Sequence, residues 1–323
     1  MSNSYFEIIR SGVNTTIQDR GRNHMYYVGI TVSGAIDQRN YKLSNKLVGN
    51  NLDEAVIEFA YQGPLLKLKN GKINLSVTGD VLFKIIRKNS NIENGVCYKN
   101  YILEDEDQID LISTKNTVYG YLSISGGLEL NKTWNSYSIN TKANVGPNNG
   151  KKYSIKDKIF IKNSDFKKIE EIEILSFIEI NYKEVPDNII RVIKGTNFDY
   201  FSTEAQNNFF NKEFSVTKLA DRMGIRLSGP KLENIVSSNI KSEGLVKGVI
   251  QVPADGNPIV MLSDHGTIGG YPKIGVVISA DLDRVGQLTP GTIINFKEVS
   301  LEEAQNIFKA YIEDTNKYLN ECN

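Results

Sequence analysis

The chain has 323 residues, enough for one large or two ordinary domains. Lys plus Arg and Asp plus Glu number 38 each, so no net charge draws the protein to nucleic acid or an anionic membrane. Its two cysteines are far apart, without metal-ligand spacing, and neither a signal peptide nor an apolar spanning segment is visible. We therefore expect a cytoplasmic protein that binds neither nucleic acid nor membranes.

Strand signals dominate the first half of the chain. Short β-branched or aromatic runs between turn residues predict strands at 6–9, 65–68, 73–77, 82–86 and 119–124.

Helix signals are few, and each begins at a capping residue. Asp37 is placed to cap a helix over Gln38–Val48 that ends at Gly49. Ser202 opens a second helix, and Ser300 with Glu303 forms a capping box for a last helix from Leu301 to about Leu319. The pattern predicts a mainly β protein with a few helices.

A turn-then-strand phrase occurs three times, at 103–111, 153–161 and 288–296. Two segments also begin alike, Ile8–Gly12 and Val192–Thr196. These weak echoes favour two related β lobes rather than a solenoid. We place the lobes at 1–185 and 186–323, since a charged stretch and a proline precede a new strand there.

Familiar catalytic motifs are missing from the sequence. The nearest approach to a phosphate-binding loop, Gly146–Lys152, is one residue short and lacks the final Ser or Thr, so we interpret it as an ordinary loop. With only His24 and His265, a multi-histidine metal site is excluded, whereas carboxylate ligation of Mg²⁺ stays open.

A first polar cluster, punctuated by glycines, lies near the N-terminus. Gln18 and Arg22 are candidates to hold a carboxylate or phosphate, and the alternative is a solvated turn in which Asp19 pairs with an arginine. Asp19 is equally a candidate for a structural capping role. Ser33 precedes a helix start whose amides could bind an anion, unless Asp37 merely caps that helix.

Glu58 interrupts an apolar stretch beyond this cluster. Such a carboxylate lies either on the outer face of a strand or buried with a partner. A buried one would be a candidate base.

The second cluster spans 221–275. Arg222 is our first candidate for a substrate carboxylate clamp, against the alternative of a surface turn. Lys273 could neutralise a carboxylate or phosphate, and Tyr271 could orient the substrate or donate a proton. If both cations neutralise charge on the substrate, their replacement by Ala should lower activity. Because we expect both to be exposed, the replacement should barely change the stability of the fold. Further candidate binding residues are Gln251, Asp264, Thr267, Gly269 and Gly270.

Seven motifs together resemble one known family, called biotin-dependent carboxyltransferase or allophanate hydrolase subunit 2. The motifs are Thr15–Arg22, Ser33–Asp37, Asn45–Asn50, Ser125–Gly127, Asp221–Gly224, Gly248–Pro253 and Thr267–Lys273. The resemblance covers essentially the whole chain and implies two cyclophilin-like β-barrel lobes. The loop Asn135–Ile139 departs from the family pattern, with Tyr137 in place of an arginine.

The family includes the C-type subunit of bacterial 5-oxoprolinase and the antagonist of a sporulation-kinase inhibitor. The resemblance implies a subunit of an ATP-dependent enzyme that opens the lactam of 5-oxoproline to L-glutamate. The implied partners are a smaller, B-type subunit and a third lactam-hydrolase subunit, and the implied cofactors are ATP and Mg²⁺, bound by or with a partner. The alternatives are a carboxyltransferase component of a biotin-dependent urea or amide carboxylase, and a non-enzymatic regulator that binds a kinase inhibitor.

Overall fold

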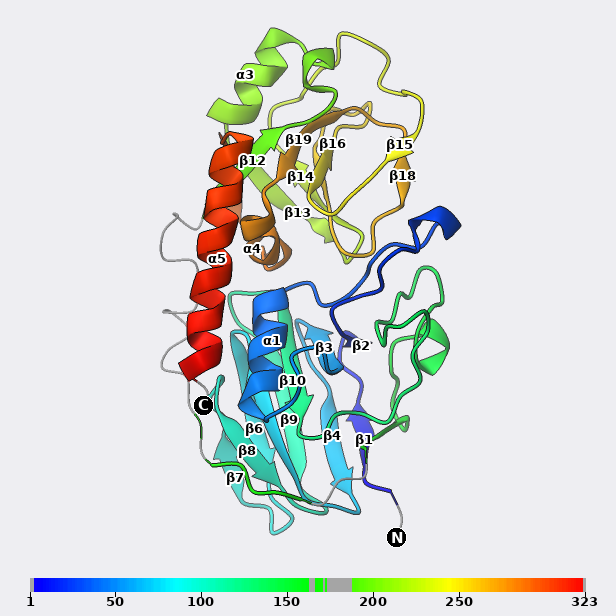
Figure 1. The fold of residues 1–323 in the computed structure, drawn as a ribbon, viewed down its shortest axis with the longest axis vertical. Coiled ribbons are helices and arrows are strands. Elements are labelled where there is room, and N and C mark those ends of the chain that lie inside the picture. Colours follow the sequence, from blue (N-terminus) through cyan, green and yellow to red (C-terminus); the bar gives the residue numbers. More distant parts are fainter. Residues whose placement is uncertain (1–2, 163–165, 171, 173–187, 322–323) are drawn as a thin grey trace. The chain divides into compact units, whose positions relative to one another are not determined.

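The computed structural model describes residues 3–162, 166–170, 172 and 188–321. The chain divides into two compact units, coloured along the sequence in Figure 1. The first unit comprises residues 1–22, 33–181 and 315–323, and the second comprises 23–32 and 182–314. The predicted boundary at 185/186 lies outside the described residues.

The first unit contains two antiparallel sheets that face each other across one apolar core. Phe6 and Phe83 enter this core from one sheet, and Phe59 and Leu122 enter it from the other. The first sheet has the order β11 (Lys158–Phe160), β1 (Tyr5–Arg10), β4 (Leu65–Lys69), β9 (Gln108–Thr114), β6 (Val81–Ile86) and β7 (Ile92–Asn94). The second has the order β2 (Asn14–Gln18), β3 (Val56–Ala60), β10 (Tyr119–Ile124), β5 (Ile73–Thr78) and β8 (Asn100–Leu103).

Helix α1 (Gln38–Leu47) packs on β5 and β10 of the second sheet. It begins where predicted, since the Asp37 carboxylate accepts the Asn40 amide at 2.9 Å. Leu43 and Leu47, four residues apart on one face, form a small apolar cluster with Tyr98 and Leu319.

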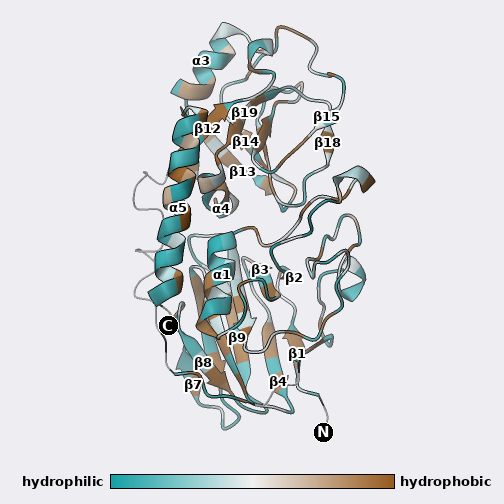
Figure 2. Ribbon diagram, in the orientation of Figure 1, coloured by the Kyte–Doolittle hydropathy of each residue, from teal (hydrophilic) through white to brown (hydrophobic). Residues whose placement is uncertain are grey.

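The second unit is built on a closed barrel. Its strand order is β12 (Ile189–Lys194), β19 (Lys273–Val277), β16 (Val249–Gln251), β17 (Ile259–Met261), β14 (Gly224–Ser228), β13 (Phe214–Ala220) and β20 (Ile293–Glu298). The parallel pairing of β12 with β20 closes the circle. Figure 2 shows apolar residues concentrated on these strands, in contrast to the largely hydrophilic α5 (Leu301–Glu321). The mainly β fold is thus confirmed.

Aromatic rings fill one part of the barrel unit. Phe209 from α3 (Thr203–Asn211) stacks on Phe296 of β20 with ring centroids 4.6 Å apart, and Phe214 packs against both. A short helix α4 (Leu282–Gly286) precedes β20. A separate two-stranded ribbon, β15 (Glu243–Gly244) with β18 (Ile268–Gly269), carries part of the second polar cluster. Short 3-10 turns complete the elements at Tyr26–Val28, Asn148–Gly150, Phe198–Tyr200 and Ser279–Asp281.

The capping box predicted at α5 is confirmed. The Ser300 amide donates to the Glu303 carboxylate at 2.7 Å, and the Glu303 amide donates to the Ser300 hydroxyl at 3.1 Å. Among the described residues, no helix combines the length and apolar character that crossing a membrane requires.

The three repeated phrases fold into the same turn. In each, the fourth residue has a positive φ: 76° at Glu106, 72° at Lys156 and 92° at Gly291. The backbone amide of this fourth residue donates to the carbonyl of one residue on a neighbouring strand. The amide of that same strand residue donates back to the carbonyl of the fifth residue of the phrase. These strand residues are Leu68, Ile8 and Val216. The echo in the sequence therefore marks a shared local structure that occurs in both units.

Candidate functional site

Asp19 organises the first polar cluster. Its buried carboxylate accepts the Gly21 amide at 2.8 Å, the Ser136 hydroxyl at 2.7 Å, the Tyr137 amide at 2.7 Å and the Ser138 hydroxyl at 2.5 Å. Four donors satisfy this charge without a cation, as hydrogen bonding can. Asp19 thus has the structural role that we gave as its alternative.

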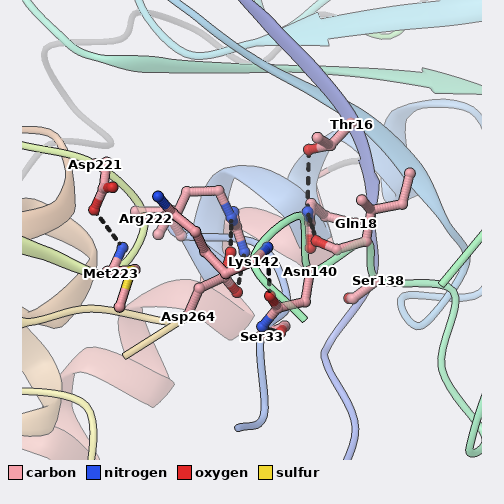
Figure 3. A network of polar contacts seen from close by, with 12 residues as sticks. Thr16, Gln18, Ser33, Ser138, Asn140, Lys142, Asp221, Arg222, Met223 and Asp264 are labelled. Atoms are coloured by element: carbon pink, nitrogen blue, oxygen red, sulfur yellow. Dashed lines mark hydrogen bonds and ion pairs between the residues drawn. The ribbon is translucent and has the colours of Figure 1, made fainter. Parts of the chain in front are cut away.

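Gln18 and Arg22 both lie buried against the same loop. The Gln18 amide nitrogen donates to the Thr16 hydroxyl at 3.0 Å and to the Ile139 carbonyl at 2.9 Å, and Arg22 donates to the Ser138 carbonyl. Figure 3 shows Gln18 between Thr16 and the loop. The solvated-turn alternative is therefore wrong for these two side chains, which hold the 136–139 loop in place.

Ser33 is joined to the next loop of the first unit. Its hydroxyl accepts the side-chain amide of Asn140 at 3.1 Å, and the Asn140 oxygen accepts the backbone amide of Lys142 at 3.1 Å (Figure 3). Gly34 follows with a φ of 83°, and a Cβ there would lie 2.8 Å from the Arg20 carbonyl. Only glycine fits this position without strain.

The helix start beside Ser33 is closed by groups of the protein itself. Glu58 is buried and accepts the Ile36 amide at 2.8 Å, while the Asp37 amide donates to the Tyr121 hydroxyl at 2.9 Å. Burial, together with the charges of Glu58 and Asp37, raises the pKa of Tyr121. With Asp37 capping the helix as well, the amides of Ile36, Asp37 and Asn40 are all bonded within the protein, as in the alternative that Asp37 caps this helix.

Arg222 and Asp264 form a two-point ion pair in the second unit. The Arg222 Nε lies 2.7 Å from Asp264 Oδ2, and its Nη2 lies 3.2 Å from Oδ1 (Figure 3). Their side chains are only 8% and 3% exposed. The preceding Asp221 turns the chain by accepting the Met223 amide at 2.8 Å. The expectation of an exposed Arg222 is therefore wrong.

Lys273 is buried as well, contrary to expectation. Its ammonium forms an ion pair with Glu243 of β15 and lies 3.4 Å from the Asn197 side-chain oxygen. The same oxygen accepts the Lys273 backbone amide at 3.1 Å. Neither Glu243 nor Asn197 carried a signal in the sequence, because each stands in an ordinary polar stretch far from Lys273.

The paired glycines are explained by packing within the chain. A Cβ on Gly269 would lie 2.6 Å from the Gln251 side-chain nitrogen, which donates to the Tyr271 carbonyl at 3.1 Å. The Gly270 carbonyl accepts the Ile240 amide at 2.8 Å, and the Thr267 carbonyl accepts the Leu245 amide at 2.9 Å. Close backbone approach was predicted at these glycines, and the groups approached here belong to the protein itself.

Tyr271 is the most exposed candidate of this cluster, at 38%. The nearby His265 is buried, with Nδ1 2.6 Å from the Gly266 carbonyl and Nε2 3.4 Å from the Tyr26 hydroxyl. Nδ1 must carry the proton to donate to a carbonyl, so Nε2 accepts from Tyr26. Burial lowers the pKa of His265 below 6.5, which favours this neutral form.

The barrel unit therefore carries two cations that are fixed in position. Arg222 is clamped by Asp264, and Lys273 is paired with Glu243. Cations held in this way on a rigid scaffold can bind a carboxylate or stabilise charge that develops on a phosphoryl group. Over the described part of the chain, no three His, Cys, Asp or Glu side chains gather to form a metal site.

Comparison with known proteins yields 5-oxoprolinase subunits and urea amidolyases among the relatives. The chain is 28% identical to the C-type 5-oxoprolinase subunit of Escherichia coli, covering 92% of each chain. It is 29% identical to the Haemophilus influenzae subunit of the same name, over 95% of this chain and 96% of that one. It is 26% identical to urea amidolyase of Saccharomyces cerevisiae, over 93% of this chain but 17% of that protein.

Among solved structures, the K. lactis urea amidolyase is similar over 98% of this chain, with a TM-score of 0.87 and 25% identity. The chain spans about a fifth of that protein, 20% of its length. The profile of a family described as carboxyltransferase domain, subdomain A and B, matches residues 28–298. The resemblance carried by the seven motifs is thus confirmed, and the chain belongs to this carboxyltransferase-domain family.

Proposed function

We propose that the chain is a subunit of an ATP-dependent 5-oxoprolinase that opens the lactam of 5-oxoproline to L-glutamate. The observation that carries the proposal is coverage. Similarity to the two bacterial subunits extends over 92% and 96% of their own lengths, whereas it covers 17% of the yeast urea amidolyase. The match thus includes nearly all of each bacterial subunit and a small part of the yeast enzyme.

The proposed reaction involves two anionic groups that the buried cations could bind. A lactam carbonyl is a poor electrophile, and transfer of the ATP γ-phosphoryl group to its oxygen, with release of ADP, would activate it. Water then adds to the carbonyl carbon and the C–N bond breaks, which leaves an acyl phosphate. A second water hydrolyses this acyl phosphate to glutamate and phosphate. Arg222 and Lys273 are proposed to hold the substrate carboxylate and the phosphoryl group.

The other candidate residues divide between binding and structure. Tyr271 is exposed enough to orient the substrate or donate a proton, with Gln251, Thr267, Gly269 and Gly270 shaping the backbone around it. Glu58, proposed as a base, has a geometry that favours a structural role, because its carboxylate holds the Ile36 amide.

We find neither a phosphate-binding loop nor a metal cluster for ATP and Mg²⁺ among the described residues. The Gly146–Lys152 segment folds back on itself, with the Gly150 amide donating to the carbonyls of Gly146 and Pro147. The described carboxylates form no metal cluster. We therefore propose that ATP and Mg²⁺ are bound by or with a smaller, B-type partner and a third lactam-hydrolase subunit.

A second candidate function is a carboxyltransferase acting on a urea-like amide. The similarity to the K. lactis urea amidolyase structure, with a TM-score of 0.87, favours it. The donor of CO₂ would then be a carboxylated biotin.

One assay separates the two functions. The full chain is purified from its native host with its co-purifying partners and given 5-oxoproline, ATP and Mg²⁺ without biotin or bicarbonate. The lactam-opening proposal expects glutamate and ADP in equal amounts, and little product from the isolated chain. Absence of glutamate, together with biotin-dependent carboxylation of urea, would overturn it in favour of the second candidate.

A further inference from the structure

The ammonium of Lys273 is held in a place where it requires a counter-charge. Its side chain is 5% exposed, and a buried ammonium is costly unless an anion faces it. Lys273 lies on β19, whose residues Lys273–Val277 are paired with β12 on one side and β16 on the other. The cation is therefore fixed to the rigid wall of the barrel.

The counter-charge of Lys273 is the Glu243 carboxylate, which lies on a short strand that is less firmly held than β19. Glu243 is 45% exposed at its side chain and lies in β15, a strand of two residues. β15 pairs only with β18, which is also two residues long, and the two form a sheet separate from the barrel. Short elements with exposed backbone bonds open at low free-energy cost.

The other half of the ribbon is well anchored. Gly269 of β18 fits tightly against the Gln251 side chain of β16, and Leu245, just after β15, is buried at 3% exposure. Movement of the Glu243 carboxylate therefore does not require the ribbon to leave the barrel, since Leu245 after it and Gly269 opposite it in the ribbon stay attached.

We propose that Glu243 is a built-in counter-ion that occupies the anion-binding position of Lys273, and that a ligand carboxylate or phosphate group displaces it. The inference rests on the proposed function for the role of Lys273 and adds the residue that controls its availability. A ligand must break an internal ion pair to bind, so Glu243 selects for ligands that bring their own anion to this place and against neutral amides of the same shape.

The test compares the full-length chain with Glu243→Gln, which keeps the shape and removes the charge. Binding of inorganic phosphate, 5-oxoproline and the uncharged 2-pyrrolidinone is measured by calorimetry. Acetylation of Lys273 by limiting acetic anhydride is read in parallel by peptide mass spectrometry. We expect Glu243→Gln to bind the anions about tenfold more tightly than the wild type does, and we expect them to protect its Lys273 amine where 2-pyrrolidinone does not. The matched control is Glu298→Gln, which removes the carboxylate of the exposed Lys194–Glu298 pair and should change neither readout.

Unchanged or weaker anion binding by a folded Glu243→Gln chain would overturn the inference. Should that variant fail to fold, Glu243→Asp keeps the charge with a shorter reach and should bind anions with intermediate affinity. Failure of both variants to fold, while Glu298→Gln folds, would make Glu243 a structural partner only. If phosphate behaves as expected and 5-oxoproline does not bind, the counter-ion assignment stands and the proposed substrate is wrong. If the complex turns over 5-oxoproline but wild type and Glu243→Gln bind anions equally, the counter-ion inference alone is wrong.

Discussion

The two glycine-punctuated clusters look alike in sequence but use their charges in different ways. In the first unit, the Asp19 carboxylate is satisfied by amides and hydroxyls of its own loops. In the second unit, carboxylates are paired with cations, Asp264 with Arg222 and Glu243 with Lys273. A carboxylate surrounded by neutral donors locks loops together, whereas a buried cation paired with a carboxylate is a group that a ligand can recruit.

The largest expected effect comes from separating the Arg222–Asp264 pair. Arg222→Ala leaves a buried carboxylate without its cation and should lower the unfolding free energy by roughly 3–5 kcal/mol. Urea denaturation of Arg222→Ala, Asp264→Ala and the double variant measures it. The double variant should lose less than the sum of the two single changes, since neither charge is then stranded. Lys194→Ala, from an exposed pair, is the control, and an equally small loss in Arg222→Ala would contradict the burial argument.

Asp19 should come next. Asp19→Asn keeps the shape but sets an amide group against hydrogen-bond donors, which should cost about 2 kcal/mol through unsatisfied buried groups. Urea denaturation again measures the change, and limited proteolysis should show earlier cleavage in the 136–139 loop. Asp53→Asn, whose partner Arg20 is exposed, is the control. A loop that stays protected in Asp19→Asn would show that Asp19 does not hold it.

The ribbon offers a sharper comparison between two glycines. Gly269→Ala must push the Gln251 amide off the Tyr271 carbonyl and should cost about 1 kcal/mol, the worth of that hydrogen bond. Gly244→Ala lies on the same ribbon with nothing within 4 Å of the added Cβ, and it should be nearly neutral. Thermal melting of the two variants decides. Equal melting temperatures would mean that the Gln251 contact contributes nothing to the ribbon.

The smallest expected effect is a pH dependence from His265. Burial lowers its pKa below 6.5, so below about pH 6.5 the unfolded chain takes up a proton that the folded chain does not. Stability contributed by the neutral ring is present above pH 6.5 and is lost as the pH falls. Unfolding free energies from pH 7.5 to 5.5 should therefore decline more steeply in the wild type than in His265→Gln. Equal pH dependence of the unfolding free energy in the two proteins would show that His265 does not cause it.

Local signals in the sequence were enough to predict the helix starts. Capping at Asp37, Ser202 and Ser300 depends on residues three positions away, so the pattern and the structure agree. The repeated turn also has a local part, because the amides of Asp107, Asp157 and Thr292 each donate to a carbonyl three residues earlier, next to the residue with positive φ.

The charge pairs could not be predicted in the same way. Lys273 and Glu243 are 30 positions apart, and the pairing of β15 with β18 brings them together. Arg222 and Asp264 are 42 positions apart, so their burial depends on the closed barrel. An expectation of exposure taken from residue type alone failed at both cations, since type does not reveal a distant counter-ion.

The last part of helix α5, which is translated at the end of the chain, packs on helix α1 near the beginning. Residues 315–323 belong to the first unit, where Leu319 covers Leu43 and Leu47, and the Thr315 hydroxyl accepts from Arg39 at 2.9 Å. Domains generally fold as the chain emerges, N-terminal parts first. Tyr98 packs on residues 43 and 47 early, but the part of their surface that Leu319 covers waits until about 270 further residues have been translated, so a nascent chain exposes that part throughout the synthesis of the barrel unit.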